Sequence, residues 1–122
     1  MKFKMLALAG FAASLFVLPA IAHHSFATFD AEQTVEFSGT VKELQWTSPH
    51  SWLQITVQNE RGEAIEWSLE MGSPRGLARS GWRPRTVVPG DEITVTLHPL
   101  IDGSPGGQLL RVVLSNGEVL GE

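Results

Sequence analysis

The stretches TVEFSGTVKELQ at residues 34–45 and WLQITVQNERGEAIEWSLE at residues 52–70 decide the fold. In the first half of the first stretch, apolar residues alternate with polar ones, which is typical of a β-strand with one buried face. Beyond Gly39 the apolar positions change parity and continue at Leu44. This change beside a glycine predicts a long strand that coils or carries a bulge.

The second stretch predicts a β-hairpin, because two runs of alternating apolar residues flank the turn sequence Asn59-Glu60-Arg61-Gly62. After it, Ser73 and Pro74 are suited to begin a short helix that Gly81 ends. Two more alternating runs follow, at residues 93–97 and 110–114. The order is three strands, a short helix and two strands, so we expect an all-β domain with one short helix. The architecture expected is a five-stranded OB-like Greek-key barrel from about Thr34 to Leu114. The expected core consists of Val35, Phe37, Val41, Leu53, Ile55, Val57, Ile65, Trp67, Leu69, Ile93, Val95, Leu97, Leu110 and Val112.

Residues 1–22 have the features of a signal peptide. A basic start is followed by an uncharged apolar run, by Pro19 and by the sequence Ala20-Ile21-Ala22, which suits cleavage after Ala22. The alternative is a membrane anchor, but small residues and Pro19 interrupt the apolar run. We therefore expect a periplasmic or secreted protein without a membrane anchor, consisting of one domain at residues 23–122.

Composition excludes several classes of function. The chain of 122 residues contains no cysteine, which excludes disulfides, thiolate metal sites and a lipid-anchored lipoprotein. Its net charge of −4 becomes −6 when Lys2 and Lys4 leave with the signal peptide. A surface of that sign does not favour nucleic acid as a partner. No G-x-S-x-G turn or other catalytic pattern is present, so the sequence does not indicate an enzyme.

Histidines provide the first candidate site. Cleavage after Ala22 makes His23 the first residue, whose α-amine and ring Nδ1 can chelate one metal ion. With His50 as a third nitrogen ligand, the set resembles a histidine brace, and copper(II) prefers such nitrogen ligation. His24 is an additional candidate ligand. The alternative for His50 is that it only hydrogen-bonds the loop in which it lies, and His98 is a weaker candidate.

Tryptophans and an arginine provide the second candidate site. Trp46 and Trp52 flank His50, while Trp82 follows the short helix that contains Arg79. These four residues indicate a module without a cofactor that binds an exported protein or a small anionic ligand. Because small barrels bind many unrelated ligands, the fold does not decide between metal and partner.

The chain also resembles a family of small exported bacterial proteins of unknown function. The resemblance covers nearly all of residues 23–122, although the family usually has Asn where this chain has Ser48. It implies export and a small β-barrel, and it implies no activity or cofactor. It rests on His23-His24-Ser25-Phe26, Gly39-Thr40-Val41, Trp46-Thr47-Ser48-Pro49-His50-Ser51-Trp52, Gly72-Ser73-Pro74, Gly81-Trp82, Pro89-Gly90-Asp91 and Asp102-Gly103-Ser104-Pro105-Gly106-Gly107.

Overall fold

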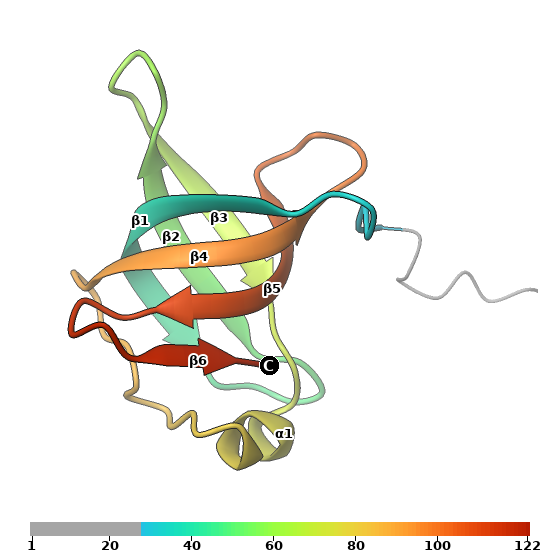
Figure 1. The fold of residues 1–122 in the computed structure, drawn as a ribbon, viewed down its shortest axis with the longest axis vertical. Helices are drawn as coiled ribbons and strands as arrows, with labels where there is room; N and C mark the ends of the chain where they lie inside the picture. The colour runs from blue at the N-terminus through green and yellow to red at the C-terminus, as the bar shows by residue number, and fades with distance from the viewer. Residues whose placement is uncertain (1–27) are drawn as a thin grey trace, which may run out of the picture.

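Six strands and one short helix form the fold in the computed structural model, which describes residues 28–122 (Figure 1). The predicted signal peptide, His23 and His24 lie outside these described residues. No helix among residues 28–122 is long and apolar enough to cross a membrane. The elements are β1 (Val35–Gln45), β2 (Trp52–Gln58), β3 (Ala64–Glu70), α1 (Pro74–Arg79), β4 (Glu92–Pro99), β5 (Gly106–Val113) and β6 (Val119–Gly121).

Five of the strands close into a barrel. Hydrogen-bonded neighbours follow the order β3-β2-β1-β4-β5-β6, and an additional pairing of β3 with β5 closes the ring. The closing pair is parallel and short, joining Ser68–Glu70 to Gly106–Gln108, whereas the other pairs are antiparallel. The mostly-β class, the short helix and the five-stranded barrel are thereby confirmed. The OB-like Greek-key assignment stays a prediction, and β6, which pairs only with β5, was not predicted.

Strand β1 pairs with two neighbours and carries the irregularity that its change of parity predicted. Its first half pairs with β4, its second half pairs with β2, and the register with β2 shifts between Val41 and Glu43. Gly39 lies where the strand curves over β2, and a Cβ there would lie 3.1 Å from both the Ile55 side chain and the Thr56 carbonyl oxygen. A larger residue would therefore push β1 away from β2.

The core follows the alternation of the strands, with a correction on β5 and with five other predicted core residues only partly buried. Leu109 is buried and Leu110 only half-buried, because the register between β4 and β5 shifts after Thr96 and leaves Leu110 without a direct partner. Val35, Phe37, Val57 and Trp67 are only partly buried against the core. Ile65 is also half-buried. The fully inward set consists of Val41, Leu53, Ile55, Leu69, Met71, Leu77, Trp82, Val87, Ile93, Val95, Leu97, Leu109, Val112 and Leu120.

Helix α1 covers the lower end of the barrel in Figure 1. The Ser73 hydroxyl accepts a hydrogen bond from the Gly76 backbone N–H at 3.1 Å, which caps the helix where the sequence predicted. Leu77 is the buried residue of α1, and Trp82 follows it into the core. The Trp82 indole N–H donates to the Gly121 carbonyl oxygen at 3.1 Å, which connects this end of the barrel to β6.

Candidate functional site

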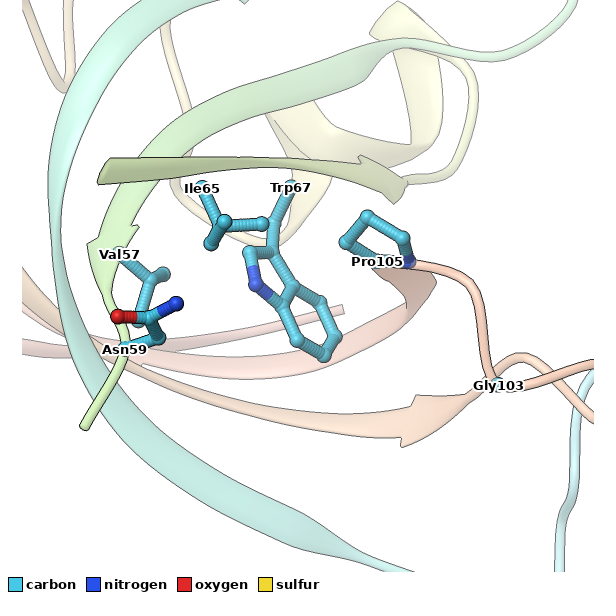
Figure 2. Close-up of a pocket in the computed structure, with 6 residues that line it drawn as sticks. All are labelled: Val57, Asn59, Ile65, Trp67, Gly103 and Pro105. Atoms are coloured by element: carbon cyan, nitrogen blue, oxygen red, sulfur yellow. The ribbon is translucent and has the colours of Figure 1, made fainter. Parts of the chain in front are cut away.

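An apolar cavity opens at the upper end of the barrel. We call it the barrel-mouth cavity, and Figure 2 shows the residues that line it. Its volume is about 330 Å³. One wall comes from the β2–β3 hairpin and the other from the loop between β4 and β5. The lining residues are Val57, Asn59, Ile65, Trp67, Gly103 and Pro105.

The cavity exists because the β2–β3 hairpin extends beyond the start of β5, the strand that pairs with the other edge of β3. Ile55 and Leu69 lie deep in the barrel and are fully buried. Val57, Ile65 and Trp67 continue the same inward faces toward the hairpin turn, since residues two apart on a strand share a face. Opposite β3, however, β5 begins only at Gly106, which pairs with Ser68. The inward residues before Ser68 are therefore left half-buried.

Trp67 is held from one side by an aromatic neighbour. The ring centroids of Phe37 on β1 and Trp67 on β3 lie 4.8 Å apart, with planes inclined by 58°. Such tilted pairs are favourable beyond the apolar area that they bury. Figure 2 shows the Trp67 side chain extending into the cavity, with Pro105 close to it. The indole is thus a fixed apolar wall with one face toward the open space.

A carboxylate lies beside each wall of the cavity. In the hairpin turn, the Asn59 side-chain amide donates to Glu63 Oε2 at 2.9 Å, and Asn59 Oδ1 accepts from the Arg61 and Glu63 backbone N–H groups. In the opposite loop, Asp102 Oδ1 accepts from the Ser104 hydroxyl at 2.5 Å and from its backbone N–H at 2.9 Å. These bonds lower the pKa of Asp102 and keep it ionised. Two carboxylates thus lie at the rim of the cavity, Glu63 through its bond to Asn59 and Asp102 as the chain neighbour of Gly103. Arg61, in the same turn as Glu63, carries the opposite charge.

His50 lies in a second, smaller cavity of about 90 Å³. We call it the His50 pocket, and its lining residues are His50, Glu70, Met71, Gly72, Gln108 and Glu122. His50 Nδ1 lies 3.0 Å from the Met71 carbonyl oxygen and 3.3 Å from Glu70 Oε1. Both neighbours accept hydrogen bonds through their oxygens, so Nδ1 is the ring nitrogen that donates here. The His50 ring therefore contacts the segment at the end of β3, whereas within its own loop the His50 carbonyl oxygen accepts from the Thr47 hydroxyl at 2.7 Å.

Glu122 contributes a perturbed carboxyl group to the His50 pocket. Burial raises the pKa of Glu122 to about 7, and the negative charge of Glu70 acts in the same direction. Two neighbours oppose this rise, namely the Gly72 backbone N–H, which donates to Glu122 Oε1 at 2.8 Å, and His50. The pocket thus combines an imidazole with two carboxyl groups.

Of the three predicted metal ligands, His50 alone lies in the described part of the chain, so their arrangement stays a prediction. His50 lies beyond the lower end of β1, while Thr28, the first described residue, is held at the upper end. There the Thr28 carbonyl oxygen accepts from the Ile101 backbone N–H at 3.0 Å. Among residues 28–122, no group of three or more His, Asp or Glu side chains could hold a metal ion. His98 Nδ1 contacts the Gln33 carbonyl oxygen at 2.6 Å, away from His50.

The predicted tryptophan and arginine surface needs a correction. Trp82 is 0 % exposed and its indole N–H is bonded within the core, so it is a core residue and offers no surface to a ligand. Trp46 and Trp52 are half-buried at the lower end, and Arg79 is exposed on α1. None of the four lines the barrel-mouth cavity. Trp67, which the sequence placed in the core, occupies the exposed apolar site instead.

A comparison with protein families gives one match. The model of DUF6152, described as a family of unknown function, matches residues 12–109. No curated protein and no solved structure matches the chain.

Proposed function

The chain belongs to DUF6152, a family of unknown function, and we propose that it is an exported binding module that takes an apolar group of its ligand into the barrel-mouth cavity. The observation that carries this proposal is an open cavity of about 330 Å³ with Trp67 as its wall. Cavities of about 300 Å³ and more, lined by hydrophobic and aromatic side chains, are the usual form of small-ligand sites.

The chemistry of the lining favours binding over catalysis. Its six residues include an amide, Asn59, and no acid, base or nucleophile. Filling such a site with an apolar group contributes roughly 25 cal/mol for each Å² of apolar surface removed from water. Trp67 adds a flat face on which an aromatic or ring-shaped group can stack.

A neutral fluorescent probe tests this proposal. N-phenyl-naphthylamine carries no charge, so the carboxylates at the rim do not repel it, and its emission increases when it leaves water. We expect one probe to bind per protein, and we expect Ile65→Arg to abolish binding by filling the cavity with a charged side chain. The matched control is Val119→Arg, which changes an apolar residue on β6 that is 53 % exposed and does not line the cavity. Equal binding by both variants would contradict the proposed site.

Copper binding at His50 is a second candidate function. The observation that favours it is the bond from His50 Nδ1–H to the Met71 carbonyl oxygen, since metal-ligating histidines commonly donate their other ring N–H to a carbonyl or carboxylate. Its ligands would be the His23 amine and ring with His50 Nε2, and His24 as an additional donor. When extended, the five residues 23–27 reach at most roughly 17 Å, which limits how the amine could approach His50 from Thr28.

His50→Ala tests this second candidate in the mature protein loaded with one equivalent of copper(II). A site built by the fold should lose about 10- to 100-fold in copper affinity and change its paramagnetic resonance spectrum. A flexible His-His terminus should keep both, because it does not use residue 50. An unchanged spectrum and affinity would therefore exclude copper binding through His50.

A further inference from the structure

We infer that the ligand of the barrel-mouth cavity is an extended peptide segment that adds a strand to the free edge of β3. This inference rests on the proposed function and names the class of ligand. The partner expected has a large apolar residue, with basic residues on either side.

The first reason is an unpaired strand edge beside the cavity. The Ser68 backbone N–H points toward β5, since it lies 3.4 Å from the Pro105 carbonyl oxygen. Backbone groups of residues two apart point to the same side of a strand, so those of Glu66 and Ala64 face the same way. Within the described chain, β5 pairs with β3 only over Ser68–Glu70. The edge at Ala64–Glu66 thus offers N–H and C=O groups to an incoming strand.

The second reason is the position of the cavity relative to this edge. A strand added there would continue the line of β5 before Gly106, where the chain itself turns away into the β4–β5 loop. Alternate side chains of such a strand point inward, toward Ile65 and Trp67. Figure 2 shows both side chains directed into the same open space. Main-chain pairing at the edge and an apolar pocket for alternate side chains together are typical of peptide recognition by strand addition.

The third reason is charge. Glu63 borders the cavity through its bond to Asn59, and Asp102 precedes Gly103 on the opposite wall. Arg61 lies in the same turn as Glu63. Glu66 does not add to the rim, because it pairs with Lys42. A basic residue on either side of the apolar anchor would meet these carboxylates, whereas an acidic peptide would be repelled.

The test uses a nine-residue synthetic peptide that alternates threonine and valine, with a central phenylalanine and a lysine at each end. We expect it to displace N-phenyl-naphthylamine from the full mature chain and to slow hydrogen exchange of the Glu66 amide. The matched peptide carries N-methyl groups on the backbone nitrogens that would face β3. It keeps the side chains and loses the main-chain bonds, so its affinity should fall about tenfold or more, given the net worth of two hydrogen bonds.

A pair of protein variants tests the same edge. Glu66→Pro removes the N–H that faces away from β2, a position at which an edge strand tolerates proline. It should weaken peptide binding about tenfold, while binding of the fluorescent probe stays the same. Glu66→Gln is the control, because it loses the Lys42 ion pair and keeps the N–H, and it should bind the peptide as the wild type does. If Glu66→Pro does not fold, the N-methylated peptide still tests whether main-chain bonds to β3 contribute to peptide binding.

The outcomes separate the two proposals. Peptide binding that N-methylation and Glu66→Pro both weaken, with Glu66 protected from exchange, supports strand addition. Equal displacement of the probe by both peptides, or no displacement by either, overturns strand addition while probe binding keeps the cavity as a ligand site. Failure of the probe itself to bind would overturn the proposed function.

Discussion

The rings of Phe37 and Trp67 pack at 4.8 Å between centroids, joining the first strand to the third across the barrel mouth. Phe37→Ala should remove this support and leave Trp67 free to change its orientation. Because Phe37 is half-buried, we expect a loss of about 1–3 kcal/mol in the free energy of unfolding. Probe affinity should fall as well. Urea denaturation and probe titration measure the two effects, and Val119→Ala on β6 is the exposed control.

Substitution of Trp82 tests whether this residue stabilises the core or binds a ligand. Trp82→Ala should lower the free energy of unfolding by about 3–5 kcal/mol, since it removes a fully buried indole and leaves the Gly121 carbonyl without its donor. Arg79→Ala, at an exposed position, should stay within about 0.5 kcal/mol of the wild type. Urea denaturation gives both values. A stable Trp82→Ala variant would contradict the buried position of this residue.

Gly107 allows β5 to lie against β4. A Cβ at this position would meet the His98 carbonyl oxygen and would lie 2.5 Å from Leu97 Cδ1. Because a backbone atom cannot give way cheaply, Gly107→Ala should cost about 3 kcal/mol or more, measured by thermal unfolding. The matched control is Gly72→Ala, where a Cβ would meet nothing within 4 Å and the change should be close to neutral.

Glu122 should make stability depend on pH. Its pKa is about 7 in the folded protein against an ordinary value of 4.5, so between these values the folded state binds more protons than the unfolded state. The favourable contribution of the neutral carboxyl is therefore complete below about pH 4.5 and is lost as the pH rises to about 7. Glu122 is exposed as a whole residue and its carboxyl group is only partly desolvated in the His50 pocket, so screening by solvent should keep the change within about 1 kcal/mol.

Denaturation of the wild type and of Glu122→Gln between pH 4 and pH 8 isolates this contribution. The glutamine variant should lack it, so the difference in stability between the two proteins should vary across this range. Glu118→Gln, an exposed position outside the His50 pocket, controls for the loss of one negative charge. A constant difference between wild type and Glu122→Gln would contradict the raised pKa.

Export remains a prediction from residues 1–22. We expect protein recovered from the periplasm to have a mass that corresponds to a chain beginning at His23, because the sequence suits cleavage after Ala22. Intact-mass spectrometry measures this directly. A retained signal peptide would contradict export, and a start at another residue would remove the terminal amine that the copper candidate requires.

Much of the fold could be predicted, because strands with one buried face show their alternation directly. The hairpin around Asn59–Gly62 and the irregular first strand followed from it. The burial of Leu109 in place of Leu110 did not follow from the alternation, because it depends on the register that β5 adopts against β4. β6 was missed because Val119–Gly121 is short and acquires its partner only through the fold.

The candidate site was harder to predict, because exposure depends on what a neighbouring strand leaves uncovered. Trp67 and Leu69 look alike in sequence, but β5 reaches Leu69 and does not reach Trp67. A usable signal was present in the loop Asp102–Gly107, whose small residues cannot cover a neighbouring apolar face. Trp82 showed the reverse problem, because a tryptophan after a surface helix gives no sign that Gly121 will accept its N–H.

The short parallel seam between Ser68–Glu70 and Gly106–Gln108 has a consequence for the order in which the chain folds. The strands β1, β2 and β3 are consecutive in sequence and can pair with one another early. The other edge of β3 pairs with β5, which lies beyond α1 and β4 in sequence, so this pairing forms later. Contacts between such distant residues form slowly, because a long loop must first close. The barrel therefore closes late. If the protein is exported as we propose, a chain whose β5 has not yet crossed the membrane cannot close its barrel.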